Sequence, residues 1–505
     1  MRLKKMGSPV SLSYVRHFFV LIVVCLLCAP VFAACHAVSP TGSGAMTGAN
    51  WSNAYANLPS TLVRGDVYYL ADGNYGTSLN ISTAASGTTT ITIKKAQAYD
   101  YGRATDGCPN DISSGWNAAT MGSAQAVWQN TSSGGGPFIH LGTGGYYIID
   151  GNGQSTPPTV GCGGVQANSP ASMTAAPSSP ADCGIKWDDS TCTATADNGC
   201  DGGAGMIRGG GPGIQLKSME IKGQGLNPAG NNDSETYGWF ATGNLSGVVL
   251  TQDYFHNMGT TDFTVTNGGW DNGCSFSYVY SWGEFDGSVN HGEAIQLQGS
   301  NGQTTPCNIH HNIFRDQQTN GDVVAVIGGT QTYNFYDNLD FCSAGGTSTT
   351  CRHNDGVIGC FNSQVCSNVK VFNNTFAEPS NCGFNVSGGA STITWENNLF
   401  YGCGSMTTNN GSGGTNTIDY NSYLNSNISA FGSHDVVDKS ATNPFVSSTS
   451  GNFQLTSDGS SYNNRLTLGS PFDTTTLYGT PFTTDRGAAQ FSPGSPVTLS
   501  GSVSQ

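Results

Sequence analysis

Short apolar stretches recur along this chain at a nearly constant interval. In each copy a usually apolar residue is followed three positions later by a polar one and, in most copies, two positions after that by an aromatic residue. The last members of successive copies lie 23 to 36 residues apart, as expected for a solenoid in which some coils carry loop insertions. Seven copies fit: Leu250-Asp253-Phe255, Ser275-Tyr278-Tyr280, Ile309-Asn312-Phe314, Phe335-Asn338-Asp340, Val371-Asn374-Phe376, Trp395-Asn398-Phe400 and Ile418-Asn421-Tyr423.

The middle position of the pattern is Asn in five of the seven copies. Asn tolerates a left-handed backbone, which suits a bend between two strands, and stacked Asn side chains can form amide ladders. Most copies contain a second β-rich run that is too short for a helix, at residues 263–265, 294–297, 323–327, 357–358 and 384–386. The pattern therefore predicts an all-β protein, a single right-handed parallel β-helix.

The ends of the chain and one internal segment depart from the repeat. Residues 1–33 have the basic start, apolar core and small residues of a signal peptide, so we expect cleavage before Ala34. A lipoprotein carrying its lipid on Cys35 is the alternative. Residues 34–435 are predicted to form the β-helix with its N-terminal cap. Within it, 155–205 form a disulfide-rich loop insertion, and residues 436–505 form a C-terminal cap.

Cysteine usage supports an exported protein. Fourteen of the 16 cysteines lie beyond the predicted signal peptide, and this even number in an exported chain predicts disulfides. The short-range candidate pairs are Cys192 with Cys200, Cys342 with Cys351, Cys360 with Cys366 and Cys382 with Cys403.

The charge of the chain limits its partners. The formal net charge is −15, and no run of 18 apolar residues follows the signal peptide. Nucleic acid and anionic membrane are therefore poor partners, and no membrane span is expected. A polyanion would also be repelled unless bound calcium or a local cluster of Arg and Lys intervened. The scarcity of basic residues favours a neutral glycan, or no glycan, over a polyuronate.

Both ends of the mature chain carry distinctive motifs: Arg64-Gly65-Asp66-Val67-Tyr68-Tyr69-Leu70 with Gly73-Asn74-Tyr75, and later Asn443-Pro444-Phe445-Val446, Gly469-Ser470-Pro471 and Asp485-Arg486-Gly487. These motifs resemble those of secreted β-helix proteins of the pectin-lyase-like superfamily. The resemblance implies the fold and an extracellular polysaccharide as partner. It does not fix an activity, because this fold carries lyases, hydrolases, epimerases and proteins without catalytic function.

Four acidic residues stand directly before second strands of successive coils. If the coils are in register, neighbouring members lie about 4.8 Å apart, the spacing of adjacent strands. Such acids can bind Ca²⁺, act as a pair in glycoside hydrolysis, or simply cap turns. The predicted calcium ligands, called the acid column below, are Asp262, Glu293, Asp322 and Asp355.

Basic and aromatic residues in the same coils supply further candidates. His291 and His353 each lie two residues before an acid of the column, where an imidazole could transfer protons. The predicted catalytic residues are Arg315, His291, Glu293, Asp322 and Arg352. The predicted substrate-binding residues are Trp270 and Trp282, which could stack on sugar rings, with His256 and His311.

The run His291-Gly292-Glu293-Ala294-Ile295, with His311-Asn312-Ile313-Phe314 and Asn320-Gly321-Asp322, resembles coils of alginate-lyase and chondroitinase-type enzymes. That resemblance implies a lyase in which an Arg or Lys removes a proton while calcium neutralises a uronate carboxylate. The chain has Gly328-Gly329 where those enzymes place a basic residue, so Arg315 or Arg352 would have to substitute. Two hypotheses stay open: a polysaccharide lyase or hydrolase, and a non-catalytic surface or adhesion protein.

Overall fold

The computed structural model describes most of the chain beyond the predicted signal peptide. The described residues are 33–131, 138–153, 162, 183–192, 205–223, 237–242, 245–258, 261–268, 273–282, 293–299, 305–317, 323–328, 330–342, 353, 356–360, 365–386, 391–411, 413–450, 452–457, 464–482 and 484–488. None of the helices in these ranges is long and apolar enough to cross a membrane.

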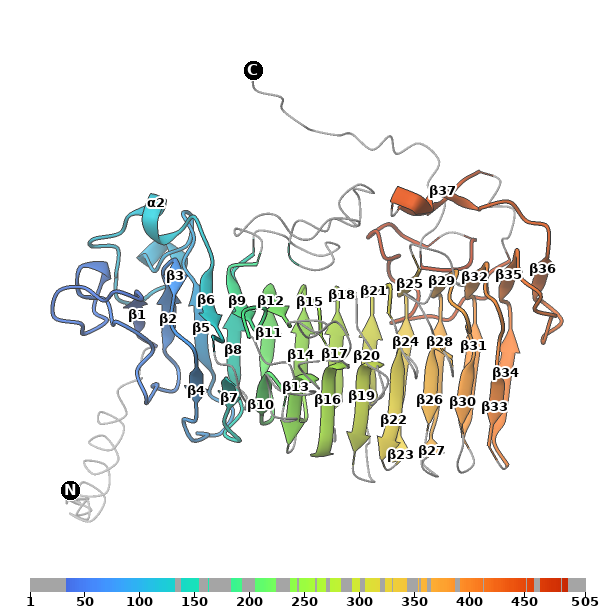
Figure 1. The fold of residues 1–505 in the computed structure, drawn as a ribbon, viewed down its shortest axis with the longest axis horizontal. Coiled ribbons are helices and arrows are strands. Elements are labelled where there is room, and N and C mark those ends of the chain that lie inside the picture. The colour runs from blue at the N-terminus through green and yellow to red at the C-terminus, as the bar shows by residue number, and fades with distance from the viewer. Residues whose placement is uncertain are drawn as a thin grey trace, which may run out of the picture.

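Three long parallel sheets run side by side along the molecule (Figure 1). Sheet A has 12 strands, in the order β1 (Cys35–Val38), β2 (Val67–Leu70), β5 (Ile91–Lys95), β8 (Tyr147–Asp150), β11 (Gln215–Lys217), β14 (Val248–Thr251), β17 (Cys274–Ser277), β20 (Cys307–His310), β24 (Tyr333–Tyr336), β28 (Val369–Phe372), β31 (Thr392–Glu396) and β34 (Thr415–Asp419).

Sheet B also has 12 strands: β3 (Gly73–Asn74), β6 (Ala126–Gln129), β9 (Ile185–Asp188), β12 (Met219–Lys222), β15 (Tyr254–His256), β18 (Tyr280–Trp282), β21 (Ile313–Arg315), β25 (Leu339–Phe341), β29 (Thr375–Ala377), β32 (Leu399–Tyr401), β35 (Ser422–Leu424) and β36 (Val436–Asp438). Sheet C has ten: β4 (Leu79–Ile81), β7 (Ile139–Leu141), β10 (Ile207–Gly209), β13 (Tyr237–Thr242), β16 (Thr261–Gly268), β19 (Glu293–Gly299), β22 (Val324–Gly328), β26 (Ile358–Cys360), β30 (Phe384–Val386) and β33 (Thr408–Asn410).

Among the described residues, few elements lie outside the three sheets. They are the parallel pair β23 (Thr330–Gln331) and β27 (Val365–Cys366), the antiparallel pair β37 (Phe445–Ser447) and β38 (Asn452–Leu455), the helix α2 (Ala118–Met121), and the 3-10 turns η1 (Trp51–Asn53), η2 (Ala104–Asp106) and η3 (Ser448–Ser450). The chain visits sheets A, B and C in turn, once per coil, and each strand pairs with its counterpart in the next coil. The predicted all-β parallel β-helix is therefore confirmed.

The predicted repeat is in register for six of its seven copies. Leu250, at the head of the first copy, pairs with Phe276, which pairs with Ile309, and the pairing continues through every later copy to Ile418. The second copy is therefore Phe276-Val279-Ser281, one residue later than predicted. The error arose because the apolar residue of this copy was placed at Ser275, whose side chain is only partly buried, whereas Phe276 is in the core.

The predicted Asn ladder is present and joins five consecutive coils. The Nδ2 atom of Asn312 donates to Oδ1 of Asn338 at 3.0 Å, and the same bond joins each following pair in the series Asn338, Asn374, Asn398 and Asn421. Each Nδ2 also donates to a main-chain carbonyl of a neighbouring coil. All five side chains are fully buried, so these amides are stable there because their polar atoms are satisfied.

The left-handed backbone lies one residue before the ladder rather than on it. Every A-to-B bend in this part of the chain has a non-glycine residue with φ between 55° and 60°: Gln252, Tyr278, His311, Asp337, Asn373, Asn397 and Tyr420. The ladder residues were therefore selected for their side-chain amides, and the predicted link between Asn and the left-handed bend was wrong for this position. The seven residues are called the bend row below.

The described part of the C-terminal region folds back over the coils. β36 continues sheet B, and the following residues cover the outer faces of the strands from β25 to β35. There, Phe445, Phe453 and Tyr478 pack into one buried cluster with Phe341 and Tyr401. Figure 1 shows this region lying over one half of the β-helix. The region predicted as a C-terminal cap thus protects the apolar outer face of sheet B as well as continuing its last strand.

Five disulfides are described. The predicted pairs Cys360–Cys366 and Cys382–Cys403 are confirmed, and Cys35–Cys108, Cys162–Cys183 and Cys274–Cys307 are additional. Because its sulfur is bonded to Cys108, Cys35 has no thiol for a lipid. Cys200 and Cys351 lie outside the described residues. Such a set of disulfides is typical of exported proteins.

Candidate functional site

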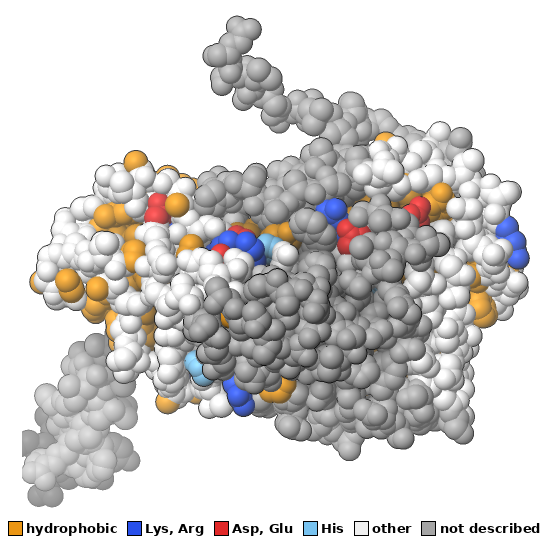
Figure 2. Space-filling view, viewed as in Figure 1, with side chains coloured by type: hydrophobic (Ala, Val, Ile, Leu, Met, Phe, Trp, Pro, Cys, Tyr) orange, Lys and Arg blue, Asp and Glu red, His pale blue; other side chains and the backbone are white. Residues whose placement is uncertain are grey.

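The outward-facing side chains of sheet B are mostly charged in one part of the sheet and apolar in another. In β9, β12, β15 and β21 the residues that face the core are Trp187, Ile221, Phe255 and Phe314. Because side chains alternate along a strand, their neighbours face outward, and here those neighbours are mostly charged. We call this set the sheet B strip: Lys186, Asp188, Glu220, Lys222, His256 and Arg315, with Asp316 directly after β21. Figure 2 shows charged and histidine side chains gathered over the middle of this face.

Glu220 is the centre of an ion-pair network that connects three coils. Its Oε1 atom lies 3.3 Å from Nζ of Lys186 and 3.1 Å from Nε2 of His256, and its Oε2 atom accepts a 2.8 Å hydrogen bond from Gln125. Lys186 also lies 3.0 Å from Asp188. The side chains of Lys186, Glu220 and His256 are 15%, 13% and 7% exposed, so only a small part of the network reaches the surface.

The network fixes the charges of its members. Burial alone would raise the pKa of Glu220, but the hydrogen bond from His256 and the charge of Lys186 lower that pKa to about 2. Burial opposes the charged form of Lys186 as well, yet Glu220 and Asp188 hold the pKa of Lys186 above its usual value. The hydrogen bond from Ser190 and the charge of Lys186 lower the pKa of Asp188 against the effect of burial. All three groups are therefore charged near neutral pH.

His256, predicted to contact substrate, is held on both sides of its ring. Its Nδ1 atom lies 2.7 Å from Oδ1 of Asn257, and its Nε2 atom faces Glu220. The ring also stacks on Tyr254 at a centroid distance of 4.2 Å. The orientation of His256 is thus set by its neighbours.

The strip continues by strand register to Arg315, a predicted catalytic residue. His256 pairs with Trp282 in β18, and Trp282 pairs with Arg315 in β21. The Nε atom of Arg315 donates to Asp316 at 3.0 Å, and its guanidinium lies 5.9 Å from the ring centroid of Phe341. The structure therefore brings three predicted residues onto one row of sheet B, at neighbouring strands.

His311 and His353 lie elsewhere. His311 is in the bend row, where its Nδ1 atom is 2.8 Å from Nδ1 of His310 and its Nε2 atom is 3.0 Å from the carbonyl oxygen of Thr475. It is 3% exposed beneath the C-terminal segment, so it is not grouped with His256 and Arg315. His353 is fully buried, with its Nδ1 atom 3.7 Å from Asp340.

The acid column is not in register where it is described. Glu293, the first residue of β19, pairs with Thr261, so Asp262 in β16 stands one residue out of line with it. Glu293 is fully buried, and the amide of Gln296 lies 3.4 Å from its Oε2 atom. In the part of the chain that the structure describes, no three His, Cys, Asp or Glu residues are placed to hold a metal ion.

Five of the predicted site residues lie outside the described residues: His291, Asp322, Arg352, Asp355 and Trp270. A calcium site at Glu293 with Asp322 therefore stays a prediction.

Lys186, Glu220 and Gln125 were missed by the sequence analysis. Lys186 falls in β9, inside the range 155–205 that its Pro, Ser and Cys content marked as an insertion, although β9 is a regular strand of sheet B. The available signal was the alternation of polar and apolar residues in Ile185-Lys186-Trp187-Asp188 and in Met219-Glu220-Ile221-Lys222.

Comparison with known proteins gives similarity of fold only. No protein-family model matches the sequence, and no curated protein matches it. Among solved structures, pectate lyase Pel9A is similar over 91% of this chain and 96% of its own, with 11% identity and a TM-score of 0.44. XylC in complex with xylose is similar over 90% and 98%, with 9% identity and a TM-score of 0.44.

A mannuronic acid specific polysaccharide family 6 lyase from human gut microbiota is similar over 80% of this chain and 83% of its own, with 12% identity and a TM-score of 0.38. These values assign no activity to this chain.

Proposed function

We propose that this protein binds a neutral extracellular polysaccharide across the sheet B strip. The observation that carries the proposal is the linked row of Lys186, Glu220 and His256, which the strand register continues to Arg315. Adjacent strands are about 4.8 Å apart, so the strip presents polar groups at regular intervals along a line. A linear polymer of sugars, which repeats its hydroxyl groups at regular intervals, suits such a surface.

The charge balance of the strip favours a neutral glycan. It contains three Lys or Arg residues and three Asp or Glu residues, and Lys186 and Arg315 are each bonded to an acid. The cations are therefore largely compensated, and the chain as a whole is acidic. A polyuronate would gain little from the strip and would be repelled by the rest of the molecule.

The protonation states favour binding over cleavage. Glycoside hydrolysis needs one carboxylic acid that can give a proton to the leaving group, and the lowered pKa values of Glu220 and Asp188 leave both without a proton at neutral pH. A Lys can remove a proton only in its unprotonated form, and the raised pKa of Lys186 keeps it protonated. These charged groups are better suited to hydrogen bonds with sugar hydroxyls than to proton transfer.

The test is a binding screen with matched variants. Affinity electrophoresis and calorimetry would compare xylan, β-glucan and mannan with polygalacturonate and alginate, with and without calcium. We expect binding to at least one neutral polymer, about tenfold weaker in Glu220→Gln and in Arg315→Ala, a loss of about 1.4 kcal/mol. Lys439→Ala is the control, because Lys439 is an exposed cation after β36, outside the strip.

Product assays on the same samples separate binding from catalysis. Absorbance from unsaturated products would indicate a lyase, and new reducing ends without it would indicate a hydrolase. Absence of binding to all five polymers, or equal affinity in the three variants, would reject the proposal in favour of a role that needs no glycan contact at the strip.

A further inference from the structure

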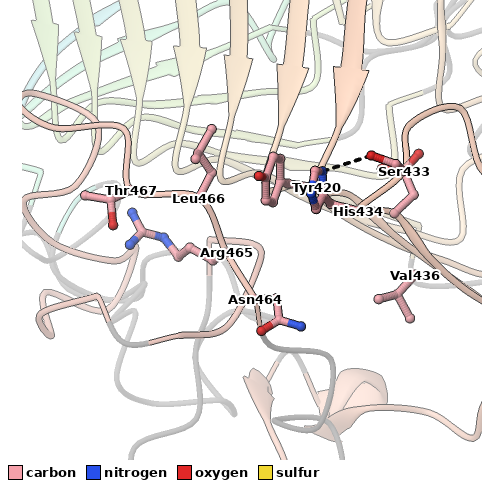
Figure 3. Close-up of a pocket in the computed structure, with 9 residues that line it drawn as sticks. Tyr420, Ser433, His434, Val436, Asn464, Arg465, Leu466 and Thr467 are labelled. Atoms are coloured by element: carbon pink, nitrogen blue, oxygen red, sulfur yellow. Dashed lines mark hydrogen bonds between the residues drawn. The ribbon is translucent and has the colours of Figure 1, made fainter.

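A second candidate site lies at the far end of the β-helix, where the C-terminal segment leaves the last coil. A cavity of about 700 Å³ opens there (Figure 3). Its walls come from the last bend at Tyr420, from the connection that leads into β36, and from residues 464–467. β25, β29, β32 and β35 separate this cavity from the sheet B strip, a distance on the order of 20 Å at the usual strand spacing.

The fold creates this cavity by covering the bend row incompletely. The C-terminal segment runs along the row, with the carbonyl of Thr475 at His311 and the carbonyl of Leu466 bonded to Asn397 at 2.7 Å. Tyr420 is the last member of the row, and it lines the cavity together with Leu466. The segment therefore covers the row up to Asn397 and leaves an aromatic residue at its open end.

Tyr420 and His434 form a flat aromatic pair at this opening. Their ring centroids are 4.3 Å apart and the planes are 5° from parallel. His434 is fixed by Asp419, whose Oδ2 atom lies 2.8 Å from Nδ1 of His434 and whose Oδ1 atom accepts the His434 main-chain N–H at 2.8 Å. The His434 side chain is 53% exposed. The two rings cover each other's inner faces, so the pair presents the outer face of a single ring, held in a set orientation on a side chain that is open to solvent.

The wall behind this pair is held in place by charged groups that are hydrogen-bonded to the main chain. Arg486 donates to the carbonyl oxygens of Asn421 at 2.6 Å and His434 at 2.7 Å. The carboxylate of Asp435 accepts main-chain N–H bonds from Asn421, Phe431 and Gly432. Asp435 is therefore a structural residue rather than a ligand-binding carboxylate, and the cavity needs little rearrangement to accept a ligand.

Neutral polar groups and one buried guanidinium complete the lining. Ser433, Asn464 and Thr467 contribute hydroxyl and amide groups. Arg465 is 6% exposed, pairs with Asp473, and lies 4.4 Å over the ring of Phe482. Its Nε–H has no hydrogen-bond partner among the described residues. A buried donor without a partner costs free energy, and an oxygen of a bound ligand would satisfy it.

We propose that this cavity binds one neutral sugar residue. A pyranose has an apolar face that suits the Tyr420–His434 pair and peripheral hydroxyls that suit Ser433, Asn464 and Thr467. The charge of Arg465 is balanced by Asp473, so its free Nε–H can bond to a neutral sugar oxygen and no ionic group is required of the ligand. This site is independent of the sheet B strip and holds a single ring or chain end rather than a polymer.

Saturation-transfer NMR on the full chain tests the proposal, with glucose, galactose, mannose and xylose at millimolar concentration as probes. We expect transfer to the ring C–H protons of at least one sugar. His434→Ala and Asn464→Gly should each weaken the binding of that sugar about tenfold. Asn464 has φ of 86°, a conformation that Gly adopts without strain, so Asn464→Gly removes the amide with little effect on folding.

Two controls separate this site from the strip and from general surface effects. Phe431→Ala changes an aromatic residue that is 46% exposed and does not line the cavity, and Glu220→Gln changes the strip. Both should retain the wild-type signal. Absence of transfer to all four sugars, or equal transfer in wild type, His434→Ala and Asn464→Gly, would overturn the proposal. Loss of polymer binding in Glu220→Gln with the sugar signal retained would show two separate sites.

Discussion

Nε2 of His256 lies 3.1 Å from Oε1 of Glu220, and this contact joins β15 to β12 on the outer face of sheet B. The same carboxylate is bonded to Lys186 in β9 and to Gln125 just before β6. One acidic side chain therefore holds together groups from four consecutive strands of the sheet. Changes at Glu220 should act on the strip as a whole rather than on one contact.

The first prediction concerns acid stability. In the folded protein the pKa of Glu220 is about 2, against an ordinary value of 4.5. Because the folded pKa is lowered, the stabilisation is fully present above about pH 5 and is lost as the pH falls from about 4.5 towards 2. Urea unfolding of Glu220→Gln should therefore differ most from wild type at neutral pH, and the two curves should converge near pH 2. A constant difference at all pH values would contradict this assignment.

The second prediction concerns the histidine pair beneath the C-terminal segment. Burial lowers the pKa of His311 to about 4 and, with the neighbouring His311, that of His310 to about 3. The unfolded chain takes up these protons near pH 6.5 and the folded chain does not, so stability should fall as the pH drops from about 6.5 to about 4. Tyr278, Tyr336 and Asp337 also face this pair.

His311→Asn isolates the contribution of His311. The fold already uses Asn at the same bend position: Asn373 donates from Nδ2 to the carbonyl of Phe472, and Asn397 does so to Leu466. The variant therefore keeps a residue suited to the bend but does not titrate. Its thermal midpoint should decline less than that of wild type between about pH 7 and about pH 5. Parallel declines in the two proteins would rule out His311 as the titrating group.

The fold was predictable because its apolar residues repeat. The core requires an apolar residue, and the ladder an Asn, at the same place in each coil. These two positions recur in the sequence at a regular spacing, and loop insertions only lengthen that spacing. The pairing register of the strands in sheet C was not predictable. The segments that precede the strands of Asp262 and Glu293 differ in length, and no sequence pattern identifies the first residue of each strand. A shift of one residue moved Asp262 out of line with Glu293.

The candidate site was predictable only in part. His256 and Arg315 were found because they follow recognised copies, whereas Lys186 and Glu220 lie in coils without the Asn signature. The position of the C-terminal segment was also hidden, because its contacts with the bend row join residues up to 164 positions apart in the sequence. Local sequence patterns cannot predict contacts between residues so far apart in the chain.

The third prediction tests how the C-terminal segment is anchored. Phe472 is 7% exposed and packs edge-on against Tyr336 and Phe372, with centroid distances of 5.1 and 4.9 Å. Phe472→Ala removes this anchor and should cost about 3 kcal/mol locally. Limited proteolysis should then cut within residues 464–482 faster than in wild type. Val446→Ala, at a residue that is 55% exposed in the same region, should not change the rate.

The last prediction tests the Asn ladder. Oδ1 of Asn374 accepts both the main-chain N–H and the Nδ2 group of Asn338, and Nδ2 of Asn374 donates to the carbonyl of Phe335. Asn374→Ala removes these three buried hydrogen bonds, and each buried group that loses its partner costs roughly 1–3 kcal/mol. The thermal midpoint measured by circular dichroism should fall by several degrees or more.

Asn409→Ala provides a matched comparison for the ladder. Asn409 makes a 3.0 Å amide bond to Asn385, the same length as the ladder bonds, but this bond is exposed to solvent. Water replaces the lost partner there, so this variant should unfold close to the wild-type temperature. Equal effects of the two substitutions would mean that the amide bonds contribute through their geometry alone. A much larger effect of Asn374→Ala would mean that the ladder stabilises the fold because it is buried. A buried amide has no water to replace a lost hydrogen-bond partner.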